Sequence, residues 1–308
     1  MQNGIVIKST GSWYQVLDEA GNKYDCRLRG KFRKDGSKST NPIAVGDKVG
    51  FSLEADTGNG IITSIADRKN YIIRKATKLS RQTHVIAANI DQAMVIATVA
   101  EPRTSTGFID RVLVTCEAYS VPAVIVFNKL DLIQTAETRQ LLEEYTLIYR
   151  EAGYPCLNVS AVDGTGLQAF ESLLRDKVTL LSGHSGVGKS SLINAIEPGI
   201  DLKVQSISKA HLKGKHTTTF AEMFPLSHGG FIIDTPGIKE FGLAHFEPEE
   251  MSHFFPEMRA LFNQCRFDNC THLNEPGCTV KEKLEEGKIS ISRYNNYLNM
   301  LSGQDTRG

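Results

Sequence analysis

A glycine-rich segment near the middle of the chain has the residue types and spacing of a phosphate-binding loop. Residues 183–190 read Gly-His-Ser-Gly-Val-Gly-Lys-Ser and fit the pattern G-x-x-x-x-G-K-[ST]. The glycines let the backbone wrap closely around phosphates, and the N–H groups of the loop offer positive charge to the anion. Lys189 would reach the outer phosphates, and Ser190 would place its hydroxyl on magnesium. The segment predicts a nucleotide site, with an ordinary glycine-rich turn as the alternative.

The elements beside this loop suit that chemistry. Residues 178–181 have the apolar character of a short buried strand, and residues 190–196 the pattern of a helix. A strand, a glycine-rich loop and a helix in this order place the loop at the helix N-terminus. The predicted phosphate contacts are Gly183, His184, Ser185, Gly186, Val187, Gly188, Lys189, Ser190 and Ser191.

Two further segments predict how a base would be chosen. Asn128, Lys129 and Asp131 directly follow the apolar run 123–127. Asp131 would accept hydrogen bonds from N1–H and N2–H₂ of guanine, Asn128 would contact N7 and brace the loops, and the stem of Lys129 could lie along the base. Adenine would leave the buried carboxylate of Asp131 unpaired, at a cost of about 1–3 kcal/mol in binding free energy. Ser160 and Ala161 end the next predicted strand, where backbone N–H groups could meet O6 of guanine.

The predicted switch residues follow the phosphate loop. Asp234 ends a strand and would hold magnesium through water, while the N–H of Gly237 would sense the γ-phosphate. Thr219, or next Thr218, could ligate magnesium when its segment orders. Together with the preceding motifs, these residues predict a guanine-nucleotide hydrolase.

The order of these motifs is unusual, and so is one of their residues. The base-recognition segments at 128–131 and 160–161 precede the phosphate loop, which indicates a circular permutation of an α/β GTPase domain. Ile238 follows Gly237, where many GTPases have a glutamine that orients water. His216 is therefore the candidate catalytic residue, with a surface histidine as the alternative, and slow intrinsic turnover is expected.

A cysteine cluster near the C-terminus predicts a metal site. Cys265, Cys270, His272 and Cys278 form the pattern C-x₄-C-x-H-x₅-C. Four such ligands close a tetrahedral zinc site with no open position, so the zinc would be structural. A metal-free group of thiols is the alternative.

The N-terminal part has the pattern of a small β-barrel. Five β-type runs occur within residues 4–65, separated by turn signals, which suits a Greek-key barrel of the OB type. The segment after the third run is basic and could meet an RNA backbone, or could simply be a solvated loop. The candidate RNA-binding residues are Arg27, Arg29, Lys31, Arg33 and Lys34.

These patterns divide the chain into three domains. Residues 1–70 would form the barrel, 71–82 a polar linker, 83–240 the permuted GTPase domain with a mostly parallel sheet, and 241–308 a helical zinc-binding domain. Within the last, residues 247–264 and 281–301 have helical patterns, the latter as one or two helices.

Composition limits where the protein could act and what it could bind. The 308 residues carry no net formal charge, but residues 1–80 hold 14 Lys and Arg against 8 Asp and Glu. No apolar run of membrane length and no signal pattern occurs, so we expect a cytoplasmic monomer that binds neither membrane nor DNA.

The chain as a whole resembles the family of small ribosomal subunit biogenesis GTPases called RsgA. The resemblance rests on the motif order, on residues 214–219 (Gly-Lys-His-Thr-Thr-Thr) and on the cysteine spacing at 265–278. It implies binding of GTP or GDP with magnesium, one structural zinc, and association with the 30S subunit and its 16S rRNA in late maturation. It also implies hydrolysis stimulated by that subunit, with a role for His216. Gly186 stands where some related GTPases have a potassium-binding asparagine, which leaves potassium dependence open.

Two other functions remain compatible with the sequence. GTP could serve only as a stabilising ligand of a regulatory RNA-binding protein, or the GTPase could act on tRNA or translation. Hydrolysis measured on and off the ribosome, and the RNA that copurifies, distinguish these functions.

Overall fold

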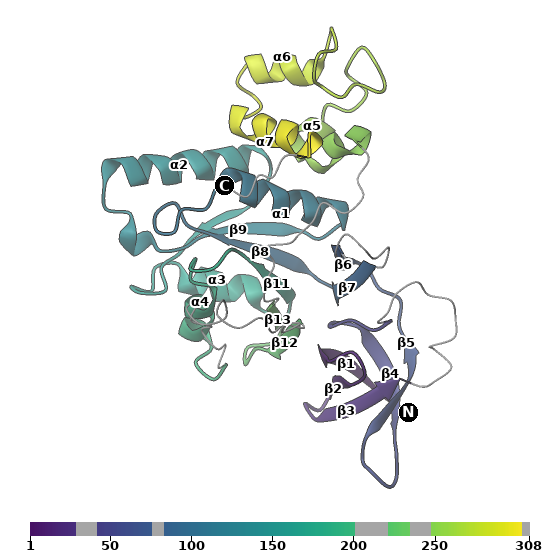
Figure 1. The fold of residues 1–308 in the computed structure, drawn as a ribbon. Coiled ribbons are helices and arrows are strands. Elements are labelled where there is room, and N and C mark those ends of the chain that lie inside the picture. Colours follow the sequence, from purple (N-terminus) through teal and green to yellow (C-terminus); the bar gives the residue numbers. More distant parts are fainter. Residues whose placement is uncertain (29–41, 76–82, 201–220, 235–247, 304–308) are drawn as a thin grey trace, which may run out of the picture. The chain divides into compact units, whose positions relative to one another are not determined.

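A computed structural model of the chain describes residues 1–28, 42–75, 83–200, 221–234 and 248–303 (Figure 1). These residues fall into two compact units. One contains residues 1–93, 171–182 and 197–244, and the other contains 94–170, 183–196 and 245–308. Among the described residues, no helix has both the length and the apolar character needed to cross a membrane.

The N-terminal strands close into a five-stranded barrel. Strands β1 and β2, β2 and β3, β1 and β4, and β4 and β5 pair antiparallel, and the parallel pairing of β3 with β5 closes the ring. Val6, Val16, Phe51 and Ile62 fill its interior and are fully buried. The predicted OB-type barrel is confirmed. Its strands are β1 (Gln2–Ser9), β2 (Tyr14–Asp18), β3 (Lys23–Leu28), β4 (Lys48–Leu53) and β5 (Gly60–Ile65).

A hairpin that the sequence did not predict follows the barrel. Strand β6 (Tyr71–Lys75) pairs antiparallel with β7 (Thr83–Ala88). The first five residues of the segment expected to be a linker are therefore a strand. The polar and basic character of this segment hid the alternation that a half-buried strand usually shows.

The first unit also contains part of the α/β sheet. Strand β11 (Val178–Ser182) is parallel to β13 (Phe231–Asp234), and β12 (Glu222–Pro225) is antiparallel to β13. Ile232 and Ile233 of β13 are fully buried, as expected for a central strand.

The second unit contains the other strands of the α/β domain and most of its helices. Strands β8 (Gln92–Ala97), β9 (Ala123–Phe127) and β10 (Cys156–Asn158) are neighbours in the order β10-β9-β8, and β9 and β10 are parallel. Ser105 caps helix α1 by accepting a hydrogen bond from the N–H of Phe108. The helices are α1 (Thr106–Ala118), α2 (Ala136–Glu151), α3 (Leu167–Leu174), which runs across the division between the units, and α4 (Lys189–Ile196). The predicted alternation of strands and helices is confirmed.

The C-terminal part is helical but more broken than predicted. The single helix expected over residues 247–264 is wrong: a 3₁₀ helix, η4 (Pro248–Phe254), precedes a short helix, α5 (Pro256–Arg259). Pro256 has no N–H to donate and disfavours helical conformation in the preceding residue, so the apolar pattern cannot continue as one helix. Two helices then follow, α6 (Thr279–Glu285) and α7 (Ile291–Leu301), separated near Gly287 at φ 71°.

Candidate functional site

The phosphate loop has a backbone that requires its glycines. Gly183, Gly186 and Gly188 have φ values of 149°, 85° and 89°. A Cβ on Gly183 would lie 2.5 Å from the carbonyl oxygen of Ile96, and one on Gly188 would lie 2.4 Å from Nδ2 of Asn128. The glycines therefore permit both the turn of the loop and its close contact with the base-recognition segment.

Lys189 begins helix α4 and folds back over the loop. Its Nζ donates hydrogen bonds to the carbonyl oxygens of Gly183, at 2.5 Å, and His184, at 3.1 Å. The ammonium is thus held above a loop whose glycines turn the backbone around it, where phosphate oxygens could replace the carbonyl partners. Ser190 and Ser191 follow in the first turn of the helix.

Asn128 joins the base-recognition segment to the phosphate loop. Its Nδ2 donates to the carbonyl oxygen of Val187 at 2.8 Å, and the residue is only 3 % exposed. Its buried Oδ1 has no hydrogen-bond partner among the described residues. A buried acceptor left unpaired is costly, and a ligand donor would satisfy it, whereas N7 of guanine can only accept and would meet the second hydrogen of Nδ2. The hydrogen bond from Nδ2 to Val187 is the expected bracing of the loops by Asn128.

Lys129 has a left-handed backbone, with φ 65° and ψ 43°. Its Nζ donates to the carbonyl oxygen of Glu101 at 2.7 Å. The ring of Pro102, in the same turn, would lie 3.3 Å from a Cβ on Gly186. The turn after β8 therefore borders both the base-recognition segment and the phosphate loop, although no motif in the sequence marked it.

Asp131 is oriented by the side chain of Ser160, a residue predicted from the sequence to contribute only its backbone N–H. The hydroxyl of Ser160, a fully buried residue, donates to Oδ1 of Asp131 at 2.7 Å. The same oxygen of Ser160 accepts hydrogen bonds from the N–H groups of Val162 and Asp163, at 3.2 and 3.3 Å. These donors leave the hydroxyl proton for Asp131 and fix the direction of the carboxylate. Ala161 follows in the same turn.

Other predicted residues are described only in part. Asp234 lies at the end of β13, in the first unit, where the sequence placed it. Arg27 lies on β3, with its guanidinium 5.0 Å from the ring centre of Trp13 and 3.2 Å from a carboxylate oxygen of Glu54. The remaining predictions fall outside the described residues: Arg29, Lys31, Arg33, Lys34, His216, Thr218, Thr219 and Gly237.

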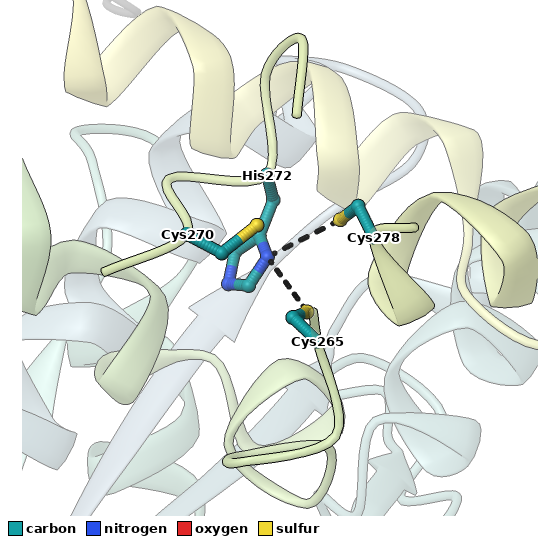
Figure 2. A group of neighbouring side chains, drawn as sticks. All are labelled: Cys265, Cys270, His272 and Cys278. Atoms are coloured by element: carbon teal, nitrogen blue, oxygen red, sulfur yellow. Dashed lines mark hydrogen bonds between the residues drawn. The ribbon is translucent and has the colours of Figure 1, made fainter. Parts of the chain in front are cut away.

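The four predicted metal ligands gather at one point of the C-terminal part (Figure 2). The ligand atoms of Cys265, Cys270, His272 and Cys278 all lie within 4.8 Å of one another. Nδ1 of His272 lies 3.7 Å from Sγ of Cys265 and 3.4 Å from Sγ of Cys278. A tetrahedral zinc site with normal bond lengths has edges of about 3.5 Å between nitrogen and sulfur. The cluster is therefore compatible with zinc.

The surroundings of the cluster favour the metal-binding form of its histidine. Burial lowers the pKa of His272, which keeps the imidazole neutral and able to bind metal. Tyr294 and Tyr297 of α7 donate to the carbonyl oxygens of His272 and Thr271, each at 2.6 Å. These two tyrosines hold the ligand loop, and only their helical spacing was visible in the sequence.

Glu275 shapes the loop between the ligands. One of its carboxylate oxygens accepts from the N–H and the hydroxyl of Thr271, and the other accepts from the N–H groups of Leu273 and Asn274. Partial burial opposes ionisation, but these hydrogen bonds lower the pKa of Glu275 to about 2. The ionised carboxylate closes the turn that carries His272.

Sequence models of one protein family match most of the chain. The model of the RsgA N-terminal domain matches residues 3–62, and the model of the RsgA GTPase matches residues 65–244. The Flavobacterium psychrophilum protein named small ribosomal subunit biogenesis GTPase RsgA is 53% identical over 305 residues, covering 98% of this chain and 93% of that protein. The protein of the same name from Bacteroides fragilis is 52% identical over 302 residues, covering 98% and 97%.

Solved structures agree with this assignment. YjeQ from Thermotoga maritima matches with a TM-score of 0.81 and 37% identity, over 100% of this chain and 99% of that one. YloQ, a circularly permuted GTPase, matches with a TM-score of 0.77 and 32% identity, over 100% and 96%. The matches and the geometry of the phosphate and base segments lead to one conclusion: the chain belongs to the RsgA GTPase family and is a GTP hydrolase with circularly permuted motifs.

Proposed function

We propose that this GTP hydrolase binds the 30S ribosomal subunit and acts in its late maturation, with hydrolysis to GDP and phosphate stimulated by the subunit. The observation that carries the proposal is the match, over 98% of the chain, to proteins named for small ribosomal subunit biogenesis. The cytoplasm is where such a reaction would take place. The protein would act there as a monomer, with no DNA or membrane partner.

In the proposed site, guanine is chosen by Asp131, which Ser160 orients. The phosphates lie on the loop of residues 183–188, with Lys189 on the outer phosphates. Ser190, Asp234 and Thr219, or Thr218, would hold magnesium, which when bound neutralises charge that develops on the phosphates. Gly237 would sense the γ-phosphate through its N–H.

The hydrolytic step would depend on His216. Ile238 has no group that can orient water. The imidazole of His216 is therefore proposed to position the attacking water or to accept a proton from it. Replacing His216 by Ala should leave GTP binding intact and lower the stimulated rate by about 10²–10⁴-fold, the usual contribution of a general base. A variant that hydrolyses GTP at the wild-type rate would rule out this role.

The other domains would supply contacts with the ribosome. The basic segment of the barrel, with Arg27, Arg29, Lys31, Arg33 and Lys34, is proposed to meet the 16S rRNA backbone. The cluster of Cys265, Cys270, His272 and Cys278 is proposed to hold one structural zinc ion.

The experiment that tests this proposal is a hydrolysis assay. GTP turnover is measured for the protein alone, with purified 30S subunits, and with 50S subunits as the control. A large increase with 30S alone supports the proposal. Equal stimulation by 50S would indicate a role in translation, and slow turnover in all three reactions would contradict stimulation by the subunit.

A further inference from the structure

The N-terminal end of helix α1 contacts the phosphate loop. The hydroxyl oxygen of Thr104 lies 2.7 Å from Nε2 of His184, and the ring of Phe108 meets the imidazole edge-on at 5.6 Å between centres. Thr104 is fully buried and lies two residues before the helix. A hydrogen bond and a ring contact therefore help to hold the phosphate loop at the N-terminal end of α1.

The neighbouring donors define the direction of this hydrogen bond. The N–H of Thr98 donates to Oγ1 of Thr104 at 3.0 Å, so the hydroxyl proton is available for Nε2 of His184. Nδ1 of the same ring lies 3.1 Å from the carbonyl oxygen of Ser185, which can only accept. The neutral imidazole with its proton on Nδ1 satisfies both contacts and fixes the ring orientation.

Helices α1 and α7 lie side by side (Figure 1), and hydrogen bonds and a buried ion pair join them. Oγ1 of Thr106 accepts from Oγ of Ser292 at 3.1 Å and from Nδ2 of Asn296 at 3.2 Å. One turn further along α1, Asp110 accepts from Arg293 and from Asn296, each at 2.6 Å. The side chains of Asp110 and Arg293 are 0% and 1% exposed, so this contact cannot slide without leaving charges unpaired.

Helix α7 in turn holds the cysteine–histidine cluster, through the bonds from Tyr294 and Tyr297 described above. The described residues therefore form an unbroken series of contacts from the phosphate loop, through α1 and α7, to the loop that carries His272. Every member of this series belongs to the second compact unit.

We propose that α1 and α7 couple the two sites, so that nucleotide on the phosphate loop and metal on the cysteine–histidine cluster each strengthen binding of the other. The inference rests on the proposed nucleotide and metal sites. Phosphate oxygens would compete for Lys189, which now bonds to the carbonyl oxygen of His184, the residue that contacts Thr104. Ordering of the phosphate loop would then restrict α1, which contacts it. Because α1 is packed against α7, the two helices would shift or lose flexibility together. Coupling is reciprocal, with a typical factor of about fivefold or more.

Thr106 provides the variant that separates coupling from binding. It contacts α7 but has no place in the nucleotide or metal site. Thr106→Val keeps the shape of the side chain and removes the hydroxyl that accepts from Ser292 and Asn296. Thr115→Val is the matched control, because among the described residues its hydroxyl bonds to the carbonyl oxygen of Arg111 within the same helix and to no other group. Ser292→Ala removes a single bond and serves if Thr106→Val does not fold.

The first measurement is hydrogen exchange of the intact, zinc-loaded protein with and without magnesium GDP. In the wild type, GDP should slow exchange in the phosphate loop, in α1, in α7 and in residues 265–278. Thr106→Val leaves the Asp110–Arg293 pair in place, so protection of α7 and of residues 265–278 should weaken rather than vanish, and Thr115→Val should behave as the wild type. Wild-type protection that ends before Ile291, or equal loss in both threonine variants, would overturn the coupling. Absence of any GDP binding would instead overturn the proposed nucleotide site.

The second measurement tests reciprocity. The Kd of a fluorescent GDP analogue is compared for zinc-loaded and chelator-treated protein, and the rate of zinc release is compared with and without GDP. Zinc removal should raise the Kd by about fivefold or more, and Thr106→Val should reduce this factor towards one. An unchanged Kd after complete zinc removal from the wild type would contradict the proposal.

Discussion

In the proposed site, base selection would depend on a pair of side chains rather than on Asp131 alone. The hydroxyl oxygen of Ser160 accepts hydrogen bonds from two backbone N–H groups, and its O–H donates a hydrogen bond to Asp131. A carboxylate that is oriented before the base arrives loses less conformational freedom on binding. The two residues are 29 positions apart in the chain and meet because β9 and β10 are adjacent and parallel.

Replacing Asp131 by Asn should shift the base preference from guanine to xanthine. An amide offers a donor where N1–H and N2–H₂ of guanine need acceptors, so the affinity for GTP should fall about 10–200-fold. The affinity for xanthosine triphosphate should rise, because that base offers an acceptor. Competition binding with both nucleotides measures the change.

A nearby carboxyl provides the control for this prediction. Asp163 lies in the turn after Ser160 and accepts a hydrogen bond from the N–H of Thr165. Asp163→Asn should leave the base preference as it is. Unchanged GTP affinity in Asp131→Asn would show that this residue does not contact the base.

At the scale of elements, the C-terminal part is anchored to α1 by a buried charge cluster. Arg293 of α7 bonds to Asp110 of α1 at 2.6 Å and to both carboxylate oxygens of Glu257 in α5, at 2.8 and 2.9 Å. Its guanidinium also lies 4.8 Å from the ring centre of Phe255. Burial opposes the charge, but the two carboxylates raise the pKa of Arg293 well above its ordinary value. The cluster fixes three helices in one arrangement.

Replacing Arg293 by Met should destabilise the protein strongly. The change leaves Asp110 and Glu257 without their counter-charge, and breaking such a pair costs about 3–5 kcal/mol. Denaturant unfolding followed by a signal from the C-terminal part measures the loss in free energy of unfolding.

An exposed arginine on a neighbouring element gives the comparison. Arg259 pairs with Glu117 at 2.8 Å, but its side chain is 50% exposed, so Arg259→Met should cost less than about 1 kcal/mol. An equal loss in free energy of unfolding in the two variants would mean that burial does not make the Arg293 ion pairs more stabilising than an exposed pair.

Across the whole molecule, the proposed zinc ion should order the region around residues 264–279, whereas the barrel and the nucleotide site should fold without it. Chelation should increase hydrogen exchange in residues 264–279, while the barrel remains folded and GTP still binds, though more weakly. Cys270→Ser should release the metal at a lower chelator concentration. Cys156→Ser, at a half-buried cysteine outside the cluster, should retain it. Loss of barrel strands on chelation would show that the metal supports more than its own loop.

The basic segment of the barrel should govern how salt affects ribosome binding. Changing Arg33 and Lys34 to Gln should weaken binding to 30S subunits and lower the slope of log K against log salt by about 0.7 for each phosphate contact with single-stranded RNA that is lost. The same changes at Arg139 and Arg150, on α2, should have little effect on the slope. Equal effects of the two pairs would place the RNA contacts elsewhere.

The class of reaction and the type of most helices and strands could be predicted from the amino-acid pattern alone. The phosphate loop, the candidate base-recognition residues and the candidate metal ligands are short patterns that depend on local spacing, so they can be recognised in the sequence before the fold is known. Strands such as β8 and β9 and helices such as α1 follow from the periodicity of apolar residues. The barrel followed from short β-type runs separated by turn signals.

The contacts that join and orient these parts became visible only in the folded protein. Asp110, Glu257 and Arg293 look like ordinary charged residues in the sequence, and their contacts span up to 183 positions. The hydroxyl of Ser160 and the bond from Asn128 to Val187 likewise arise from neighbouring segments that are distant along the chain. Such pairs depend on the packing of whole elements, which no local pattern encodes, and the break at Pro256 shows where local geometry overrules a periodic pattern.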